Sequence, residues 1–491
     1  MSPLRLHPAA ARASARAPSV HRARRVDRVR RALALLPSLS LAWALALPAG
    51  PARAEAEVPL AFDLTRAHAF TGIGAQTWLN PAHPGEAAAL LRDMHAQVLR
   101  LSVLPKMDAA ALGPGPLSLA QARERLEAAT TAEQRGRVAA LRQLAEQQHL
   151  RLHLVFWAMP EHWAEARDRK AGKKKVAHLA NMDRVPDYVN LITAELMMLR
   201  QAGLTVEAVE LTNEPQGAWD TKYEPDQYAE LVLQARRRFD EQGLQAVRID
   251  GPGTGLRNFA EFERGLRAKG ALGALGFMTA HVYQSPEQLA RDETPGVAGF
   301  LGQGRIAPIM ITEFGVKKHN DEDAELAAAD TDVDSPSYGL QTAAESLQLL
   351  GKGAQSVIYW QLEDLNFTKK KHGMLDAAGR RRPVAQAVQA LFGGVAGQGR
   401  LVGAEGGPAL LPATAVLADG RVWLLMANAT GQAQSVNARV QGAGALRALG
   451  AHRAWAGGLS PEAALQGLSW RDGVLRATLA PGAVVSVELL P

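Results

Sequence analysis

Short apolar runs rich in β-branched residues alternate with helical patterns along most of this chain, and this alternation limits the fold more than any other feature. Eight such runs lie at residues 70–77, 97–103, 150–157, 208–214, 247–253, 276–283, 308–314 and 356–363. Helical patterns separate them at 85–95, 137–148, 186–202, 225–242 and 338–350. Strands that alternate with helices build a parallel sheet. Eight repeats within about 330 residues predict an α/β fold, a (β/α)8 TIM barrel, over residues 65–392.

An open doubly wound sheet is the alternative arrangement of strand and helix units. Open sheets usually have fewer units, and no Gly-x-Gly-x-x-Gly sequence follows the first strand. The glycine-rich segment at 251–255 lacks the lysine and the spacing of a phosphate-binding loop, so we interpret it as a plain turn. The barrel is therefore the favoured arrangement.

The composition shifts toward Gly, Ala and Val from about residue 393. Runs in which apolar and polar residues alternate lie at 421–428, 435–440, 474–479 and 484–490, and turn sequences such as Asp-Gly separate them. This pattern predicts a C-terminal all-β sandwich domain over residues 393–491. We expect residues 58–64, within the 55–64 segment that precedes the barrel, to supply it with an extra strand.

The first 54 residues resemble a targeting segment. They contain a basic stretch that ends at Arg31, an uncharged run at 32–52, and a small-residue cleavage site at Ala54. We therefore predict a signal peptide and a secreted or periplasmic protein without a membrane span after processing. Two alternatives stay open: the uncharged run is nearly long enough to remain as an anchor, and the Arg-Arg pair before it could belong to a twin-arginine signal.

Charge and composition exclude several classes of function. The formal charge is +6, but the first 54 residues hold ten arginines against one acidic residue, so the remainder is slightly acidic. General nucleic-acid binding has no support from such a balance. The absence of cysteine excludes disulfides, thiolate metal sites and cysteine nucleophiles. His281, His319 and His372 lack the spacing of metal ligands, so we predict neither a catalytic metal nor a cofactor.

Two glutamates lie at the ends of predicted barrel strands. Glu214 ends the fourth strand in an Asn-Glu-Pro sequence, and Glu313 ends the seventh in a Thr-Glu-Phe-Gly sequence. A barrel keeps its chemistry at the carboxyl ends of its strands, so both carboxyl groups should face one cleft. A single glutamate at a strand end is more often a solvated loop residue. Two at these positions favour catalysis, because hydrolysis of a glycosidic bond requires a pair of carboxyl groups across that bond.

The sequences around both glutamates resemble the acid/base and nucleophile motifs of the clan A retaining glycoside hydrolases. Arg100 on strand two, His281 and Tyr283 on strand six, and Trp360 on strand eight also agree with that clan. The resemblance covers about residues 65 to 395. A Gly-Ile-Gly sequence on strand one, the sequence at 156–163 and the sandwich after the barrel are most similar to family 30, with families 5 and 39 as neighbours.

The resemblance implies double displacement, with Glu313 as the nucleophile and Glu214 as the acid/base. Arg100 and Tyr283 are the expected partners of the Glu313 carboxylate, and Asn213 is expected to donate a hydrogen bond to the substrate 2-hydroxyl. Structural roles stay open for Arg100, as a member of an ion pair, and for the strand-six histidine, as a core residue.

Two further carboxylates, Glu363 and Asp364, follow strand eight. We expect them to orient other side chains or to bind sugar hydroxyls, and they are the second choice for an acid.

Tryptophans gather at or just after predicted strand ends: Trp78, Trp157, Trp163, Trp219 and Trp360. Sugar rings present apolar C–H faces, so indole rings at the mouth of a cleft are suitable platforms for them. Core packing explains any one of these residues equally well, but their clustering on one face favours substrate binding.

Lysines gather in the predicted loops of the same face, at 170–175, 317–318 and 369–371. We take as a hypothesis that they select an anionic glycan, for example one that carries uronic acids. The alternative is that they are solvated loops, which charge runs usually are.

These patterns and the resemblance predict an exported retaining glycoside hydrolase that cleaves β-glycosidic bonds of a polysaccharide or oligosaccharide. The alternative is a non-catalytic carbohydrate-binding or cell-envelope protein on the same scaffold, although binding alone needs no carboxyl pair. A lyase or a phosphate-handling aldolase is disfavoured, because no lysine ends strand six and no Gly-rich phosphate site follows strands seven and eight.

Overall fold

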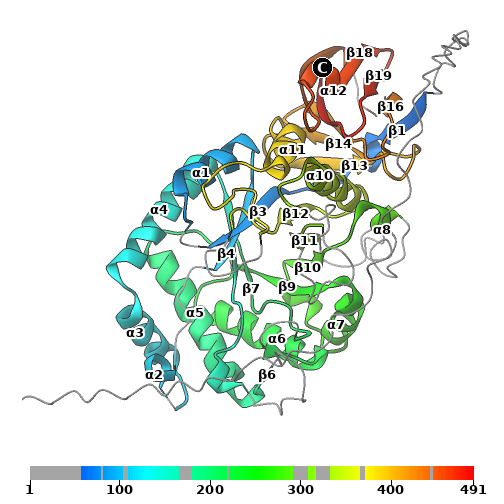
Figure 1. Ribbon diagram of the computed structural model, residues 1–491. Coiled ribbons are helices and arrows are strands. Elements are labelled where there is room, and N and C mark those ends of the chain that lie inside the picture. Colours follow the sequence, from blue (N-terminus) through cyan, green and yellow to red (C-terminus); the bar gives the residue numbers. More distant parts are fainter. Residues whose placement is uncertain are drawn as a thin grey trace, which may run out of the picture. The chain divides into compact units, whose positions relative to one another are not determined.

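The computed structural model describes residues 57–78, 81–102, 109–113, 115–164, 178–217, 221–290, 308–316, 332–364, 371–442 and 446–491 (Figure 1). They belong to one unit, Glu55–Pro491. At its centre, eight parallel strands form a closed barrel, which confirms the predicted fold and all eight predicted strands. In barrel order they are β3 (Gly72–Trp78), β4 (Val98–Ser102), β5 (Arg151–Val155), β7 (Ala208–Glu210), β9 (Arg248–Gly255), β10 (Phe277–Val282), β11 (Ile309–Phe314) and β12 (Ser356–Tyr359).

Helices surround the barrel (Figure 1). They are α1 (Pro84–Asp93), α2 (Ala109–Leu112), α3 (Leu119–Ala129), α4 (Ala132–Gln148), α5 (Val185–Gln201), α6 (Pro225–Glu241), α7 (Leu256–Ala268), α8 (Pro286–Ala290), α10 (Pro336–Gly351) and α11 (Pro383–Phe392). Short elements complete this part: β6 (His178–Leu179), which pairs with β8 (Thr221–Lys222), and the 3-10 turns η2 (Glu161–Trp163), η3 (Met182–Arg184) and η4 (Leu272–Ala274).

Local sequence signals explain where these helices start. Thr131 caps α4 through a reciprocal pair of hydrogen bonds with Gln134, and proline occupies the first turn of α1, α5, α6, α10 and α11. Capping satisfies backbone N–H groups that have no partner within the helix, and proline there loses no hydrogen bond. The main apolar core lies between the helices and the strands, so the barrel interior is left for other residues.

The barrel interior is partly apolar and partly charged. Val98, Phe277, Met310 and Ile358 form a small buried cluster of their own. Charged side chains from β4, β5, β7, β9, β10 and β11 occupy other positions in the strands, including the residues of the candidate site described below. Such a buried charged layer needs matched partners, because isolated buried charges are strongly disfavoured.

The glycine-rich segment at 251–255 forms the second half of β9, so its interpretation as a plain turn is wrong. A Cβ atom at Gly251 would lie 1.9 Å from the Tyr228 hydroxyl, and a Cβ atom at Gly253 would lie 1.7 Å from Glu210 Oε1. Gly253 also has φ of +59°. These glycines therefore mark the close approach of two side chains to the strand backbone, which is a common reason for glycine inside a strand.

Two sheets form the β-domain. The first contains, in order, β1 (Val58–Asp63), β16 (Gln434–Gln441), β19 (Val474–Leu479) and β18 (Leu465–Arg471). The second contains β17 (Ala448–Trp455), β20 (Val484–Leu490), β15 (Arg421–Ala427), β14 (Ala413–Ala418), β13 (Gly399–Gly403) and β2 (His68–Phe70). The turns η1 (Leu64–Arg66) and α12 (Pro461–Ala464) connect strands, and a second apolar core belongs to this domain.

Both sheets take an edge strand from the segment before the barrel. β1 pairs in parallel with β16, as the sequence predicted for residues 58–64. β2 pairs with β13 and was not predicted.

The predicted targeting segment lies outside the described residues. Within the described part of the chain, no helix combines the length and the apolar character that crossing a membrane requires.

Candidate active site

Glu214 and Glu313 meet at the carboxyl end of the barrel. Glu313 lies on β11, and Glu214 lies four residues beyond the end of β7. One carboxylate oxygen of each lies within 4.8 Å of the other. Carboxyl groups in retaining glycosidases lie about 5 to 5.5 Å apart, whereas those of inverting enzymes are about 6.5 to 9.5 Å apart. The spacing therefore matches a retaining pair.

The backbone beyond β7 explains how Glu214 reaches this position. The regular strand ends at Glu210, but Asn213 N–H still donates to Trp157 O (3.1 Å) and Glu214 N–H to Gly253 O (3.2 Å). The chain thus stays between its neighbouring strands. Glu214 itself has φ of +48°, a left-handed conformation that non-glycine residues adopt at a cost and that is frequent at functional sites.

Arg100 joins most of the site. This fully buried residue of β4 donates from Nη1 to Glu313 Oε1 (2.7 Å) and to Gln76 Oε1 (2.9 Å). Its Nη2 donates to Asn213 Oδ1 (3.0 Å), and its Nε donates to Glu210 Oε2 (3.2 Å). The predicted contact between Arg100 and Glu313 is therefore present, within a larger network that also fixes Asn213. The Asn213 amide nitrogen, which is the donor expected for the substrate, takes no part in that bond.

The surroundings of Glu313 keep its carboxyl group ionised. Tyr283, just after β10, donates its hydroxyl to Glu313 Oε2 (2.7 Å). Burial alone would raise the pKa of Glu313, but the charges of His281 and Arg100 together with the Tyr283 hydrogen bond outweigh burial and lower this pKa. An ionised carboxylate is what a nucleophile requires.

His281 lies between the two glutamates. Its Nδ1 atom is 2.9 Å from Glu214 Oε1 and 3.4 Å from Glu313 Oε2. Burial would lower the pKa of His281, yet the carboxylates of Glu313, Glu214 and Glu210 outweigh it and raise this pKa. His281 therefore contacts both glutamates of the candidate pair, and its role in substrate binding stays a prediction.

Glu210 and Gln76 are part of this network, and sequence reasoning missed both. Glu210 is almost fully buried on β7, and Gln76 is fully buried on β3. The sequence contains a signal for each residue. Glu210 interrupts an apolar run four residues before Glu214, and Gln76 interrupts another run two residues before Trp78. Alternate residues of a barrel strand face the same side, so such a residue points into the barrel.

Three tryptophans form a row at the ends of β3, β5 and β12. The ring centroids of Trp78 and Trp157 are 5.3 Å apart, and those of Trp157 and Trp360 are 5.8 Å apart. All three are partly buried. Trp163, in contrast, is buried beneath the guanidinium of Arg184, 4.7 Å from its ring, which indicates packing. Trp219 lies outside the described residues.

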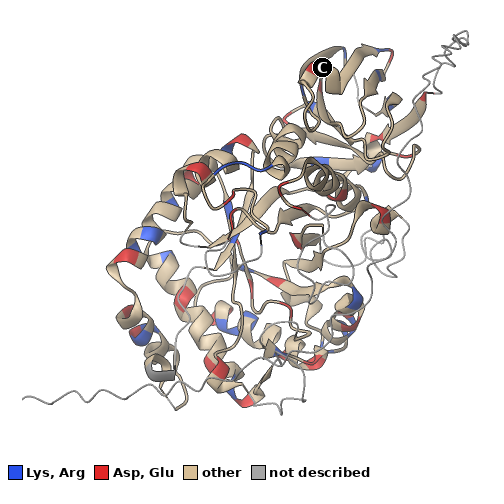
Figure 2. Ribbon diagram, in the orientation of Figure 1, with Lys and Arg blue, Asp and Glu red and all other residues tan. Residues whose placement is uncertain are grey.

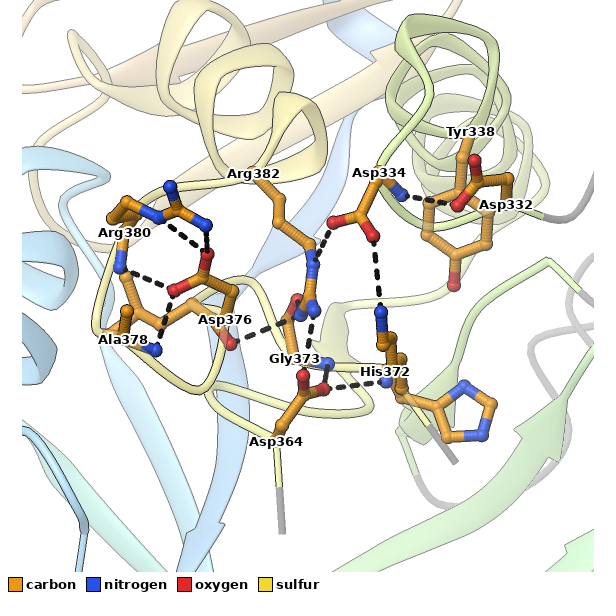
Figure 3. Close-up of polar contacts among 12 residues, drawn as sticks. Asp332, Asp334, Tyr338, Asp364, His372, Gly373, Asp376, Ala378, Arg380 and Arg382 are labelled. Atoms are coloured by element: carbon orange, nitrogen blue, oxygen red, sulfur yellow. Dashed lines mark hydrogen bonds and ion pairs between the residues drawn. The ribbon is translucent and has the colours of Figure 1, made fainter. Parts of the chain in front are cut away.

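Glu363 and Asp364, the second choice for the catalytic acid, follow β12 and accept hydrogen bonds from backbone N–H groups. Glu363 accepts hydrogen bonds from the N–H groups of Ala82 and His83, just before α1. Asp364 accepts hydrogen bonds from the N–H groups of His372 and Gly373, at 3.0 and 2.9 Å, and pairs with Arg382 (Figure 3). Asp364 thus orients the Arg382 side chain, whereas the contacts of Glu363 are with the backbone; binding of sugar hydroxyls stays a prediction.

The lysine clusters fall mostly outside the described residues, as does His319. Lys371 is described: it is exposed, and its Nζ lies 3.7 Å from Asp334 Oδ2. Basic and acidic residues are interspersed over the described helices (Figure 2). Selection of an anionic glycan therefore stays a prediction.

The atoms of Glu214, His281 and Glu313 that could bind a metal lie within 4.8 Å of one another. The engaged oxygen of Glu214 already faces His281 Nδ1, and both oxygens of Glu313 already accept hydrogen bonds. His281 Nδ1, Glu214 Oε1 and both Glu313 oxygens are therefore already engaged by protein contacts.

The barrel and its β-domain define a fold class shared with the clan A glycoside hydrolases. The family 30 subfamily 8 xylanase Xyn30A from Clostridium acetobutylicum aligns with a TM-score of 0.64 and 13% identity, over 88% of this chain and 100% of that chain. An endo-β1,6-glucanase aligns with a TM-score of 0.62 and 14% identity, over 89% and 94%. The family 39 enzyme from Xanthomonas axonopodis pv. citri gives 0.51 and 15%, over 89% and 98%.

These comparisons confirm, for the fold, the predicted similarity to family 30 with family 39 as a neighbour. No protein-family model matches the sequence, and no curated protein does. At such low identity the similarity shows the fold alone.

Proposed function

We propose that this protein is a retaining glycoside hydrolase that cleaves β-glycosidic bonds of a polysaccharide or oligosaccharide. The proposal rests on one observation above all: one carboxylate oxygen of Glu214 lies within 4.8 Å of one of Glu313, and Arg100 and Tyr283 bind the Glu313 carboxylate. This arrangement gives one group the role of a nucleophile and leaves the other to transfer protons.

The reaction has two steps. In the first, a Glu313 oxygen attacks the anomeric carbon while Glu214 gives its proton to the departing glycosidic oxygen, so that a glycosyl-enzyme ester forms and the leaving group departs as an alcohol. In the second, Glu214 takes a proton from water, the water oxygen attacks the same carbon, and the ester bond to Glu313 breaks. Asn213 donates its amide N–H to the 2-hydroxyl, a contact that strengthens in the transition state.

The row formed by Trp78, Trp157 and Trp360 supports a carbohydrate substrate, because indole faces stack on the C–H faces of sugar rings. Solved structures with a similar fold include a xylanase and an endo-β1,6-glucanase, which supports a polymeric or oligomeric substrate. The lysine-rich sequences support an anionic glycan, and the leader sequence supports export. Equal cleavage of neutral and uronate-bearing versions of one glycan, at low and high salt, would remove the anionic preference.

Covalent trapping tests the proposal directly. The protein is incubated with a panel of 2-fluoro glycosides that carry activated leaving groups, and the intact mass is measured for the wild type, Glu214→Gln and Glu313→Gln. We expect an adduct in the wild type that maps to Glu313 and is absent from Glu313→Gln. If no sugar gives an adduct while the protein still binds glycans, the enzyme proposal fails in favour of a carbohydrate-binding protein.

A further inference from the structure

A third carboxylate lies beneath the catalytic pair, and the two-step reaction above does not use it. Glu210 of β7 is only 2% exposed. Its Oε2 accepts from Arg100 Nε at 3.2 Å and lies 3.1 Å from Arg100 Nη2. Its Oε1 lies 3.8 Å from His281 Nε2. Glu210 therefore stands between the two cations that contact the catalytic glutamates.

We propose that Glu210 is a positioning residue: it holds the guanidinium of Arg100 against Glu313, and it keeps a proton on His281 so that Nδ1 donates toward Glu214. This inference rests on the proposed hydrolase function. It assigns a role to a residue that touches neither substrate nor reacting atoms.

Arg100 supports the first half of the proposal. A guanidinium has five N–H donors in a fixed plane. One edge of Arg100, formed by Nε and Nη2, faces Glu210, while Nη1 faces Glu313 and Gln76. Because the plane is rigid, fixing one edge fixes the direction of the opposite donors. Loss of the Glu210 carboxylate would free that edge and leave Arg100 with one buried counter-charge in place of two.

His281 supports the second half. Its Nε2 and Glu210 Oε1 face each other, and neither has a hydrogen-bond partner among the described residues. A carboxylate on this side favours a proton on Nε2 and stabilises the doubly protonated ring. Nδ1 then also carries a proton, and it is the atom that faces Glu214 Oε1 at 2.9 Å and Glu313 Oε2 at 3.4 Å.

The backbone leaves room for this carboxylate at one position of the neighbouring strand. A side chain at Gly253 would place its Cβ 1.7 Å from Glu210 Oε1, and the residue has φ of +59°. A glycine at a close approach of this kind indicates that the carboxyl group has a fixed place in the fold.

Other charged groups near Glu210 bear on its ionisation. The pKa of Glu210 is raised: burial raises it most, Glu313 and Asp250 add to this effect, and Arg100 and His281 oppose it without cancelling it. The Tyr228 hydroxyl, from α6, is a further titratable group near this carboxyl. The two cations thus favour the charged form of Glu210, and Glu210 in turn favours their charged forms.

Glu210→Gln tests the inference, with Glu195→Gln as the matched control. Glu195 is also a buried carboxyl group, but it lies on α5, and burial is the only cause that raises its pKa. The first readout is NMR of the imidazole signals, which needs no substrate. We expect the His281 titration midpoint to fall by about one pH unit or more in Glu210→Gln, because a buried counter-charge is lost, and to stay unchanged in the control.

The second readout is the pH profile of kcat and KM on an activated aryl glycoside. Glu210→Gln should lower kcat about 100-fold with little change in KM, since misplaced catalytic groups reduce the rate of chemistry. The alkaline limb of the profile, where kcat falls as the pH rises, should move to lower pH because His281 loses its proton at lower pH. Glu210→Asp keeps the charge, so it should restore part of kcat and move the alkaline limb part of the way back to its wild-type pH.

An unchanged His281 midpoint together with an unchanged pH profile in Glu210→Gln would overturn the inference, even if that variant were less stable. If Glu210→Gln does not fold, Glu210→Ala is measured instead. A wild-type His281 midpoint and a wild-type pH profile in that variant would also overturn the inference. If the wild type cleaves no glycoside, the proposed function fails, while the imidazole titration still decides the role of Glu210.

Discussion

His153 should make the stability of this protein depend on pH well above neutrality. The imidazole lies inside the barrel on β5, 2% exposed, with Nδ1 2.8 Å from Asp250 Oδ2 and Nε2 3.2 Å from Glu207 Oε2. Only the doubly protonated ring presents a donor to both carboxylates. Burial lowers the pKa of His153, but Asp250 and then Glu207 outweigh burial and raise it to about 9.

The size and sign of the effect follow from this pKa. The ordinary value is 6.5, so the native state binds the proton more tightly than the unfolded chain does. Each pKa unit corresponds to about 1.4 kcal/mol, so the protonated ring contributes about 3 kcal/mol. This contribution is complete below pH 6.5, the unfolded value, and is lost as the pH rises through about 9. Folded domains are typically stable by about 5 to 15 kcal/mol, so the loss should be easily measured.

The assay compares two proteins between pH 6 and pH 9.5. Urea unfolding of the wild type is set against a double variant, His153→Gln with Asp250→Asn, which removes the charge pair without leaving a buried charge alone. We expect the wild type to lose about 3 kcal/mol more than the variant across this range. NMR of the imidazole signals should place the His153 midpoint near 9. Parallel stability curves, or a midpoint near 6.5, would refute the reasoning.

Four further substitutions test other parts of the structure. Glu214→Gln should lower kcat about 1,000-fold on a glycoside with a poor leaving group and spare the first step with an activated one, as burst kinetics would report. Arg100→Lys keeps the charge but cannot meet four acceptors, so kcat/KM should fall about 100-fold in steady-state assays. Gly253→Ala should cost about 2 kcal/mol or more in urea unfolding; Gly270→Ala, at φ +69° with open space around it, is the control for backbone strain alone. Trp157→Ala should raise KM about 10-fold with a smaller change in kcat, because a stacking platform is lost.

The barrel could be predicted because its strands are buried on both faces, which makes them continuous apolar runs in the sequence. The glutamates at 214 and 313 could be located for a related reason: each follows such a run at the end where a barrel carries its chemistry. The β2 strand could not be found, because three residues at a sheet edge are too short to show a period.

Polar residues inside the barrel were harder to predict. Glu210, His153 and Asp250 sit within strands and look, in sequence, like isolated exceptions to an apolar run. Their partners come from strands distant in the chain, so only the closed barrel brings them together. The glycines of β9 were misinterpreted for the same reason, since the side chains that exclude a Cβ there belong to β7 and α6.

The edge strands β1 and β2 have a consequence for the order in which the protein can fold. Each sheet of the β-domain takes one strand that is synthesised before the barrel and others that are synthesised after it. All barrel strands leave the ribosome earlier than β13 to β20, so β1 and β2 must wait, unpaired, until the last part of the chain is made. A fragment that starts after the barrel would lack one strand in each sheet and expose the edges of β16 and β13, which are templates for aggregation. Both sheets of the β-domain can therefore be complete only in a chain that also contains the barrel.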